Sequence, residues 1–360
     1  MPDENKLRIA LVAYLLGFGG SERSIIQLGN EMVERGHDVY LVSAASNNPK
    51  YDIDARIHSM EIAGDEERNR VASIIRRFLF LNRALRKIGP DITVHFWYQS
   101  VYLCALSNKK HIGKQVYSER ADPMDKRFRG LLGFVRSATV RRVDKLVFQT
   151  DSAKTSFPKA AANRSAVISN PVYVASDPLN QACEMERRII NIGRLYPQKN
   201  QSLLIDAFHL FEKRKPGYIL EIYGDGPLKA LLQKQITSLN LEKKVFLMGT
   251  VNNVAERMRN ASLFVLSSDY EGMPNALLEA MAVGLPCVTT NWRPGAAREI
   301  LDEDCDGMIV PCDSPGELCD AMQVMAEVGY SSRNAKVIRK RYTPAKIYNK
   351  WENLFKSLVR

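Results

Sequence analysis

The chain has 360 residues, which is too many for one ordinary hydrophobic core and suits two domains. Its 45% hydrophobic and 25% charged residues are typical of a soluble globular protein, and its apolar runs are far shorter than the roughly 20 residues of a membrane-spanning helix. The net charge of +11 is uneven, because residues 1–180 hold 27 Lys and Arg against 19 Asp and Glu. A nucleic acid, a phosphorylated ligand or an anionic membrane surface could each explain this basic half.

The first predicted elements alternate between strand and helix. Residues 7–16, "LRIALVAYLL", form a continuous apolar strand that leads into the loop "GFGGSER". A helix over 24–36 and a strand over 37–44 complete a βαβ unit, so we expect a parallel sheet. Further strands of this sheet are predicted at 91–97, 114–120 and 144–150.

Two segments of this half are strongly basic. Residues 68–89 contain seven cations and no acid, and residues 125–144 contain six cations with an Asp at each end. Both mix apolar and basic residues at helical spacing. Such a pattern is typical of a helix on anionic lipid, but also of an ordinary helix with a solvated basic face. Nucleic acid is not expected as a partner, because no recognisable nucleic-acid-binding module accompanies the charge.

A hinge and a second strand–helix series follow. Residues 166–178, "AVISNPVYVASDP", carry two prolines and small polar residues, and we predict a domain boundary between residues 172 and 173. Strands are then predicted at 187–193, 218–224, 244–249, 262–268, 286–291 and 307–311. The expected fold class is α/β, with two doubly wound domains whose ligands bind at the carboxyl ends of the strands.

The six cysteines, at positions 104, 183, 287, 305, 312 and 319, form no CxxC pair, which favours a reducing compartment over disulfides or zinc. The polar start "MPDENKLR" lacks the layout of a signal peptide. We therefore expect a cytoplasmic protein.

The loop "GRLYPQKN" leaves a predicted strand with two cations, Arg194 and Lys199. A planar guanidinium and a compact ammonium on one loop suit a diphosphate, although a solvated loop would look the same. The loop "GDGP" at 224–227 follows another strand, and an ordinary turn explains it equally well.

The stretch "EGMPNALLEA" places Glu271 and Glu279 around a turn between an apolar strand and a helix. Pro274 fits the first turn of that helix, which leaves the amides of Met273, Asn275 and Ala276 for an anion or a sugar hydroxyl. Carboxylates accept paired hydrogen bonds from vicinal hydroxyls. One glutamate could therefore hold a sugar and the other a ribose, whereas a surface glutamate and a turn glutamate would be the ordinary explanation.

Taken together, these segments resemble the family 4 retaining glycosyltransferases, which have the GT-B fold. "GRLYPQKN", the Glu-x7-Glu block "EGMPNALLEAMAVGLPCVTT", "RPGAAREIL" with "DGMIV", and "GFGGSER" carry the resemblance over nearly the whole chain. It implies two facing Rossmann-like domains, residues 1–172 and 173–342, with the ligand cleft between them. It also implies that a last helix, residues 343–360, crosses back to the N-terminal domain.

The resemblance implies a role for each matching residue. Arg194 and Lys199 would neutralise the departing nucleoside diphosphate, Glu271 would contact the donor sugar, and Glu279 would bind the ribose. Gly19 and Gly20 would lie close to the diphosphate. No metal or other cofactor is expected, and the acidic triplets at 52–54 and 302–304 do not stand where a metal would be needed.

One departure from the family concerns the acceptor side. Many members carry a histidine where this chain has Arg120 beside Glu119 in "SERADP", and we expect both residues to bind the acceptor. On a helix Lys126, Arg129 and Arg136 would share a face that could hold an acceptor's diphosphate.

The function that we expect is therefore transfer of a hexosyl or N-acetylhexosaminyl group. The donor is a nucleotide sugar, with uridine as the expected base, and the acceptor is a lipid-diphosphate-linked glycan of bacterial polysaccharide or glycoconjugate assembly. The enzyme would be peripheral on the cytoplasmic face of the inner membrane. A nucleotide-sugar epimerase of the same fold and a non-catalytic basic binding protein remain the alternatives.

Overall fold

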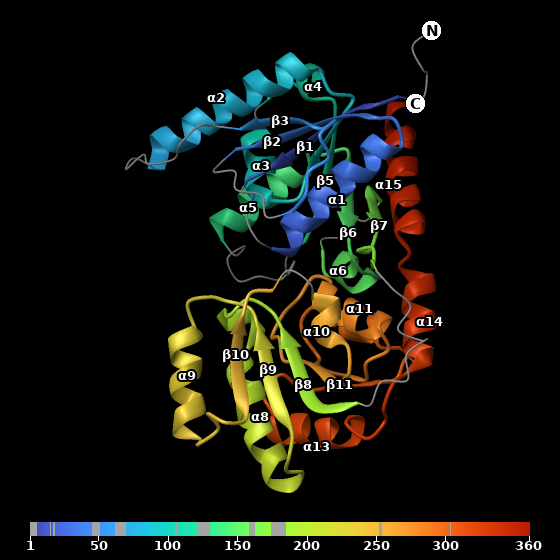
Figure 1. The fold of residues 1–360 in the computed structure, drawn as a ribbon. Helices are drawn as coiled ribbons and strands as arrows, with labels where there is room; N and C mark the ends of the chain where they lie inside the picture. The colour runs from blue at the N-terminus through green and yellow to red at the C-terminus, as the bar shows by residue number, and fades with distance from the viewer. Residues whose placement is uncertain are drawn as a thin grey trace. The chain divides into compact units, whose positions relative to one another are not determined.

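The structure is a computed structural model. It describes residues 6–14, 16, 19–44, 51–61, 70–104, 107–120, 130–157, 163–173, 185–251, 254–302 and 304–360. The chain divides into two compact units (Figure 1). Unit 1 comprises Met1–Asn170 and Ala345–Arg360, and unit 2 comprises Pro171–Pro344.

Unit 1 is built on a parallel sheet whose strand order is β3-β2-β1-β4-β5-β6-β7. Its strands are β1 (Arg8–Ala13), β2 (Asp38–Ser43), β3 (His58–Glu61), β4 (Ile92–His95), β5 (Lys114–Ser118), β6 (Lys145–Phe148) and β7 (Ser165–Val167). The predicted hinge at 166–178 thus begins inside a strand, because Ser165, Ala166 and Val167 pair with β6.

The helices of unit 1 are α1 (Gly20–Glu34), α2 (Arg70–Ile88), α3 (Tyr98–Cys104), α4 (Lys109–Ile112), α5 (Leu131–Val140), α6 (Asp151–Thr155) and α15 (Pro344–Val359). Helix α1 begins four residues before the predicted start. Helix α2 buries Leu81 and Leu85 against Val12 and Val42 of the sheet. None of the helices described in the chain combines the length and the apolar character that a membrane span requires.

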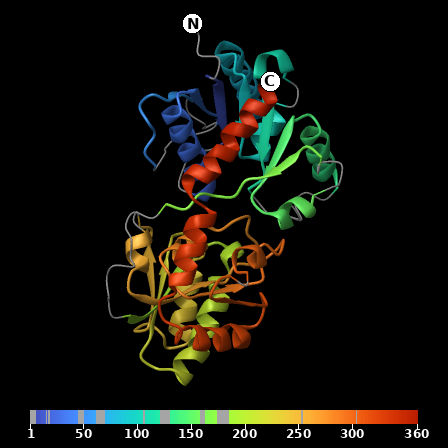
Figure 2. The same ribbon diagram turned by 90° about the vertical axis from the view of Figure 1, so that its right-hand side faces the viewer.

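Helix α15 packs within unit 1, although it is the last element of the chain. In Figure 2 it is the red helix beside the blue and green elements of this unit. Trp351 stacks on Phe96 with ring centroids 6.1 Å apart. Glu352 accepts a 2.6 Å ionic hydrogen bond from Arg35, the C-cap residue of α1.

Unit 2 has a second parallel sheet, in the order β10-β9-β8-β11-β12-β13. Its strands are β8 (Glu186–Ile192), β9 (Ile219–Tyr223), β10 (Val245–Gly249), β11 (Ala261–Leu266), β12 (Cys287–Thr290) and β13 (Gly307–Val310). With this sheet the prediction of two doubly wound α/β domains is confirmed.

Helices surround the second sheet. They are the 3-10 helix η3 (Pro197–Lys199), α8 (Gln201–Arg214), α9 (Lys229–Ser238), α10 (Val254–Met258), α11 (Asn275–Ala282), α12 (Ala297–Ile300), α13 (Pro315–Met325) and α14 (Ser332–Arg341). Helix α8 inserts Phe208 and Phe211 into a core that includes Leu220 and Ile222 of β9.

The strand order identifies where ligands are expected. In unit 2 the connections run outward in opposite directions from β8 and β11, and in unit 1 they do so from β1 and β4. Such switch points open a crevice beyond the carboxyl ends of the two strands, which is where doubly wound folds bind their ligands.

Candidate functional site

Lys199 and Glu271 meet at the switch point of unit 2. Lys199 ends η3, in the connection that follows β8, and Glu271 follows β11. The Lys199 ammonium forms an ion pair with Glu271 Oε1 across 72 residues of sequence. Both side chains are largely buried. The sequence predicted both residues for the site, and the structure brings them into direct contact.

Glu271 is held by neutral groups as well. Ser268 Oγ donates to Glu271 Oε1 at 2.7 Å. Gln198 Nε2 donates to the Tyr270 carbonyl at 2.8 Å and lies 3.4 Å from Glu271 Oε2. The carboxylate is therefore held on both oxygens, so it can present a fixed acceptor to a ligand.

Arg194 stands at the start of the same loop and is exposed. Its guanidinium lies over the Tyr196 ring at 5.1 Å, and its carbonyl accepts a 3.1 Å hydrogen bond from Gln201. Among the residues that the structure describes, no carboxylate pairs with Arg194. Its charge is therefore available to an anionic ligand.

The loop "GDGP" at 224–227, which follows β9, packs against the loop that carries Arg194. Gly224 has a φ of +141°, and a Cβ there would lie 2.0 Å from the Gly193 carbonyl oxygen. Two backbone hydrogen bonds of 2.9 Å, from Gly193 to Tyr223 and from Leu195 to Asp225, join the two loops. The glycine permits the close approach that positions Arg194.

Helix α11 begins at Asn275, and Pro274 is its N-cap with no side-chain cap. The proline thus lies one residue before the first turn in which we expected it. Met273 is buried, and Glu279 is half-buried in the second turn. The helix N-terminus points its backbone amides toward the end of β11, as an anion or hydroxyl site requires.

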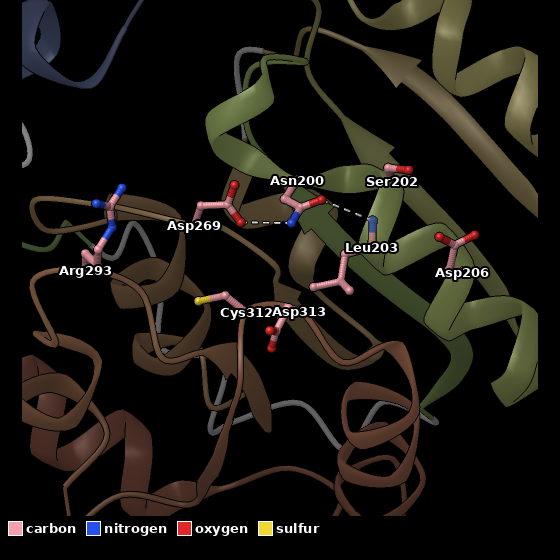
Figure 3. Close-up of a pocket in the computed structure, with 8 residues that line it drawn as sticks. All are labelled: Asn200, Ser202, Leu203, Asp206, Asp269, Arg293, Cys312 and Asp313. Atoms are coloured by element: carbon pink, nitrogen blue, oxygen red, sulfur yellow. Dashed lines mark hydrogen bonds between the residues drawn. The ribbon is translucent and has the colours of Figure 1, made fainter. Parts of the chain in front are cut away.

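Unit 2 has an open polar pocket of about 640 Å³ (Figure 3). Two of its lining residues, Asn200 and Asp269, are close in sequence to Lys199 and Glu271. Its lining comprises Asn200, Ser202, Leu203, Asp206, Asp269, Arg293, Cys312 and Asp313. Asn200 Nδ2 donates to Asp269 Oδ1 at 2.8 Å. Burial raises the pKa of Asp269, an effect that Asn200 opposes. Carboxylates, an amide and a guanidinium together suit a hydroxyl-rich ligand.

Sequence reasoning missed these pocket residues and the two groups that hold Glu271. Asp269, Arg293 and Cys312 each follow a strand of the parallel sheet, so the rule that ligands bind at carboxyl ends could have identified them. Gln198 and Ser268 also follow strands, β8 and β11, but the sequence does not show that their side chains meet Glu271, because that contact depends on the packing of the two loops.

The remaining predicted residues belong to unit 1. Gly19 is the N-cap of α1 and Gly20 its first residue. Lys126 and Arg129 lie outside the described residues. Glu119 is 4% exposed and Arg136 is 6% exposed.

We expected Arg136 to lie on an open basic face, and this prediction is wrong, because Arg136 is buried. Its guanidinium is buried in an ion pair with Glu119 Oε2 and lies over the Phe157 ring at 4.7 Å. Glu119 also accepts a 2.9 Å hydrogen bond from Tyr117. The pair satisfies two charges inside the unit, which explains why neither is presented to solvent.

Comparison with known proteins places each unit in a described family. Residues 18–175 match "Glycosyltransferase Family 4", and residues 178–338 match "Glycosyl transferases group 1".

Two curated relatives match over most of their length. An uncharacterized glycosyltransferase of Haemophilus influenzae is 24% identical, covering 93% of this chain and 96% of that protein. A Campylobacter jejuni protein is 26% identical over 89% of this chain and 90% of its own. It is named N-acetylgalactosamine-N,N'-diacetylbacillosaminyl-diphospho-undecaprenol 4-alpha-N-acetylgalactosaminyltransferase.

Solved structures show the same fold. Alr3699/HepE of Anabaena, in complex with UDP and glucose, superposes with a TM-score of 0.83 at 18% identity, covering 98% of this chain and 100% of that one. TarM of Staphylococcus aureus gives 0.79 at 15% identity, covering 97% and 99%.

Proposed function

The chain belongs to the group 1 glycosyltransferases that carry a family 4 N-terminal domain, and from this membership we propose the reaction that it catalyses. It moves a sugar, with retention of configuration, from a UDP-sugar to a glycan that is linked to a lipid through a diphosphate. The product belongs to bacterial polysaccharide or glycoconjugate assembly. The observation that carries the proposal is the ion pair of Lys199 and Glu271 at the switch point of unit 2, in the loop that also carries Arg194, for which the described residues provide no carboxylate partner.

The proposed chemistry follows from this arrangement. Breaking the bond between the sugar and the nucleotide leaves negative charge on a diphosphate, which Arg194 and Lys199 would stabilise in the transition state. Glu271 would hold the sugar's hydroxyls, so that an acceptor hydroxyl attacks a fixed anomeric carbon. Glu279 would bind the ribose, and the amides of Met273, Asn275 and Ala276 would contact the sugar or the diphosphate. In this proposal the two cations neutralise the leaving group, and no metal is required.

The proposed donor and acceptor are supported by relatives. UDP is named in the Alr3699/HepE and TarM structures. The names of two Campylobacter jejuni relatives, 24% and 26% identical, specify acceptors built on undecaprenol through a diphosphate. Gly19, Gly20, Arg120, Lys126 and Arg129 remain predictions for the donor and acceptor sides. Glu119 is left out of this proposal, because it is buried with Arg136.

We propose that the enzyme meets its acceptor on an anionic membrane surface through α2. Ile74, Ile75 and Leu79 on this helix are 57%, 53% and 60% exposed. No acidic residue occurs between positions 68 and 89. Exposed aliphatic residues among cations suit the boundary between lipid headgroups and acyl chains. Because Arg136 is buried, α2 replaces the predicted face around Arg136 in this proposal.

The test is a matrix of nucleotide sugars against lipid-diphosphate-linked glycans, with the anomeric configuration of each product determined by NMR. We expect one UDP-sugar to give a product that retains the donor's α configuration. An inverted product would contradict the retaining mechanism. Formation of a new UDP-sugar epimer without acceptor would favour the epimerase.

A further inference from the structure

Arg120 is a half-buried arginine without a carboxylate partner among the described residues. Its Nε donates to Ser118 Oγ at 3.0 Å, and its Nη1 donates to Asn170 Oδ1 at 2.5 Å. Its guanidinium lies 4.1 Å from the centroid of the Phe96 ring. The adjacent Glu119 is already committed to Arg136 and Tyr117.

Several other partly buried arginines are paired with acids, whereas Arg164 donates to backbone carbonyls. Arg136 pairs with Glu119, Arg188 with Glu186 and Glu221, and Arg35 with Glu31 and Glu352. Burial lowers the pKa of the Arg120 guanidinium, and Tyr348 of α15 opposes this shift only in part, so the folded protein holds this charge at a cost. An unpaired, partly desolvated cation is favourable when it meets an anion.

The surroundings of Arg120 lie beyond the ends of four neighbouring strands of the sheet. Phe96, Arg120, Gln149 and Asn170 follow β4, β5, β6 and β7, respectively. Gln149 Nε2 donates to Asn170 Oδ1 at 2.7 Å, so this oxygen accepts from both Gln149 and Arg120. The amide, the ring and Ser118 thus orient the guanidinium at the carboxyl ends of parallel strands, where such folds bind ligands.

We propose that Arg120 is the anion receptor of unit 1 and binds the diphosphate of a substrate. This inference rests on the proposed function for the identity of the ligand, because both the nucleotide sugar and the lipid-linked acceptor carry a diphosphate. It goes beyond that function in assigning the charge to one residue and in stating why this arginine has no acid partner among the described residues. A carboxylate partner would occupy the guanidinium that the diphosphate must reach.

The first experiment uses inorganic pyrophosphate and needs no turnover. Arg120→Gln, Arg120→Lys and native protein are compared by thermal melting and by hydrogen exchange of the amides that follow β5 and β7. Arg35→Gln is the matched control, because Arg35 is a half-buried arginine of the same unit with acid partners. Hydrogen exchange of these amides reports on binding in unit 1, so it distinguishes binding at Arg120 from binding of pyrophosphate at Arg194 and Lys199 in unit 2.

We expect Arg120→Gln to melt at or above the native temperature without ligand, because it removes an unpaired buried charge. Arg35→Gln should melt lower and keep the native response to pyrophosphate. Pyrophosphate should slow exchange in native unit 1 and require at least about tenfold higher concentration in Arg120→Gln, with a partial response in Arg120→Lys. The proposal is overturned if Arg120→Gln melts as far below native as Arg35→Gln, or if its exchange responds as in native protein.

A second experiment identifies the source of the diphosphate. Loss of the exchange response to UDP in Arg120→Gln would assign the site to the donor. A raised KM for a short-chain polyprenyl-diphosphate-linked glycan, but not for the same glycan without the diphosphate, would assign it to the acceptor. If no acceptor is used by the native protein while pyrophosphate still protects unit 1, the anion site stands and the proposed function fails.

Discussion

At the level of single residues, the two cations of the proposed site, Lys199 and Arg194, differ in their surroundings. Lys199 is paired with Glu271, whereas Arg194 is exposed without an acid among the described residues. A bound diphosphate would compete with Glu271 for the ammonium, and Ser268 and Gln198 would keep the carboxylate in place. The ion pair is therefore a preorganised part of the site rather than a source of stability alone.

We predict that Arg194→Ala or Lys199→Ala lowers turnover by at least about 100-fold, because each removes a charge from the leaving group, an effect of roughly 3 kcal/mol on the barrier. Steady-state rates with saturating donor measure the effect. Lys215→Ala is the control, since Lys215 pairs with Glu327 at the surface of the same unit and should keep native turnover. Near-native rates in both site variants would contradict the assignment.

Substitution of Glu271 and of Glu279 should affect different kinetic parameters. Glu279→Ala should mainly weaken binding of free UDP, because a ribose contact is made in the ground state and the transition state alike. Glu271→Ala should mainly lower kcat, because this carboxylate would touch the reacting sugar. Calorimetric titration with UDP and steady-state rates measure the two effects. The opposite pattern would exchange the two roles.

At the element scale, α2 is unusual because its exposed face is not uniformly polar. Ile75, Leu79, Arg83 and Arg86 fall on one stripe at helical spacing, and all four are exposed. The apolar pair precedes the basic pair, so the stripe can combine shallow insertion with attraction to anionic headgroups.

We predict that the double variant Ile75→Ser, Leu79→Ser weakens binding to phosphatidylglycerol vesicles by about tenfold or more, since each aliphatic side chain loses up to about 1.5–3 kcal/mol of burial. Cosedimentation measures the affinity. Leu231→Ser is the control, because Leu231 of α9 is 61% exposed in unit 2. If the double variant and the control lose vesicle affinity equally, α2 is an ordinary solvated helix and not the membrane-binding element. Binding by the native protein should also weaken as salt screens the cations.

At the scale of the whole molecule, the end of the chain returns to unit 1. A cluster of charged residues joins α15 to a distant part of the chain. In it Glu352 of α15 contacts Lys356 of the same helix, Arg35 at the C-cap of α1, and buried His37. Although burial by itself would raise it, hydrogen bonds from Lys356 and Arg35 hold the pKa of Glu352 at about 2. The docking of α15 is therefore linked to pH.

We predict that Glu352→Gln flattens the acid dependence of unit 1 stability. A carboxylate with a depressed pKa stabilises the fold above its unfolded value near 4.5, and this contribution is lost as the pH falls toward 2. The native protein should thus be more stable than the variant at pH 7, and the gap should shrink between pH 4.5 and pH 2. Hydrogen exchange of β1 and β2 reports on unit 1.

Glu327→Gln is the control for this pH dependence. Glu327 pairs with Lys215 on the exposed surface of unit 2, so its removal should change stability little. Parallel pH curves for native protein and Glu352→Gln would show that the cluster does not hold α15.

The fold class and the loops proposed for the site can be predicted from the amino-acid pattern alone. Buried parallel strands are continuous apolar runs, as in "IALVA" and "SLFVL", and their spacing with helices predicts doubly wound sheets. Arg194, Lys199 and Glu271 could be nominated because each follows such a run.

Which of these residues meet depends on the packing of the two loops and cannot be read from the sequence. Lys199 and Glu271 are 72 positions apart, and their contact depends on β8 and β11 being neighbours, which periodicity does not encode. The same holds for Arg136 and Arg120. A helical pattern predicts that one face is buried, but not that Arg136 would find Glu119 inside the unit. Nor does it predict that Arg120 would be left with neutral partners. Burial and charge pairing are properties of the packed chain, because they depend on residues brought together from distant loops.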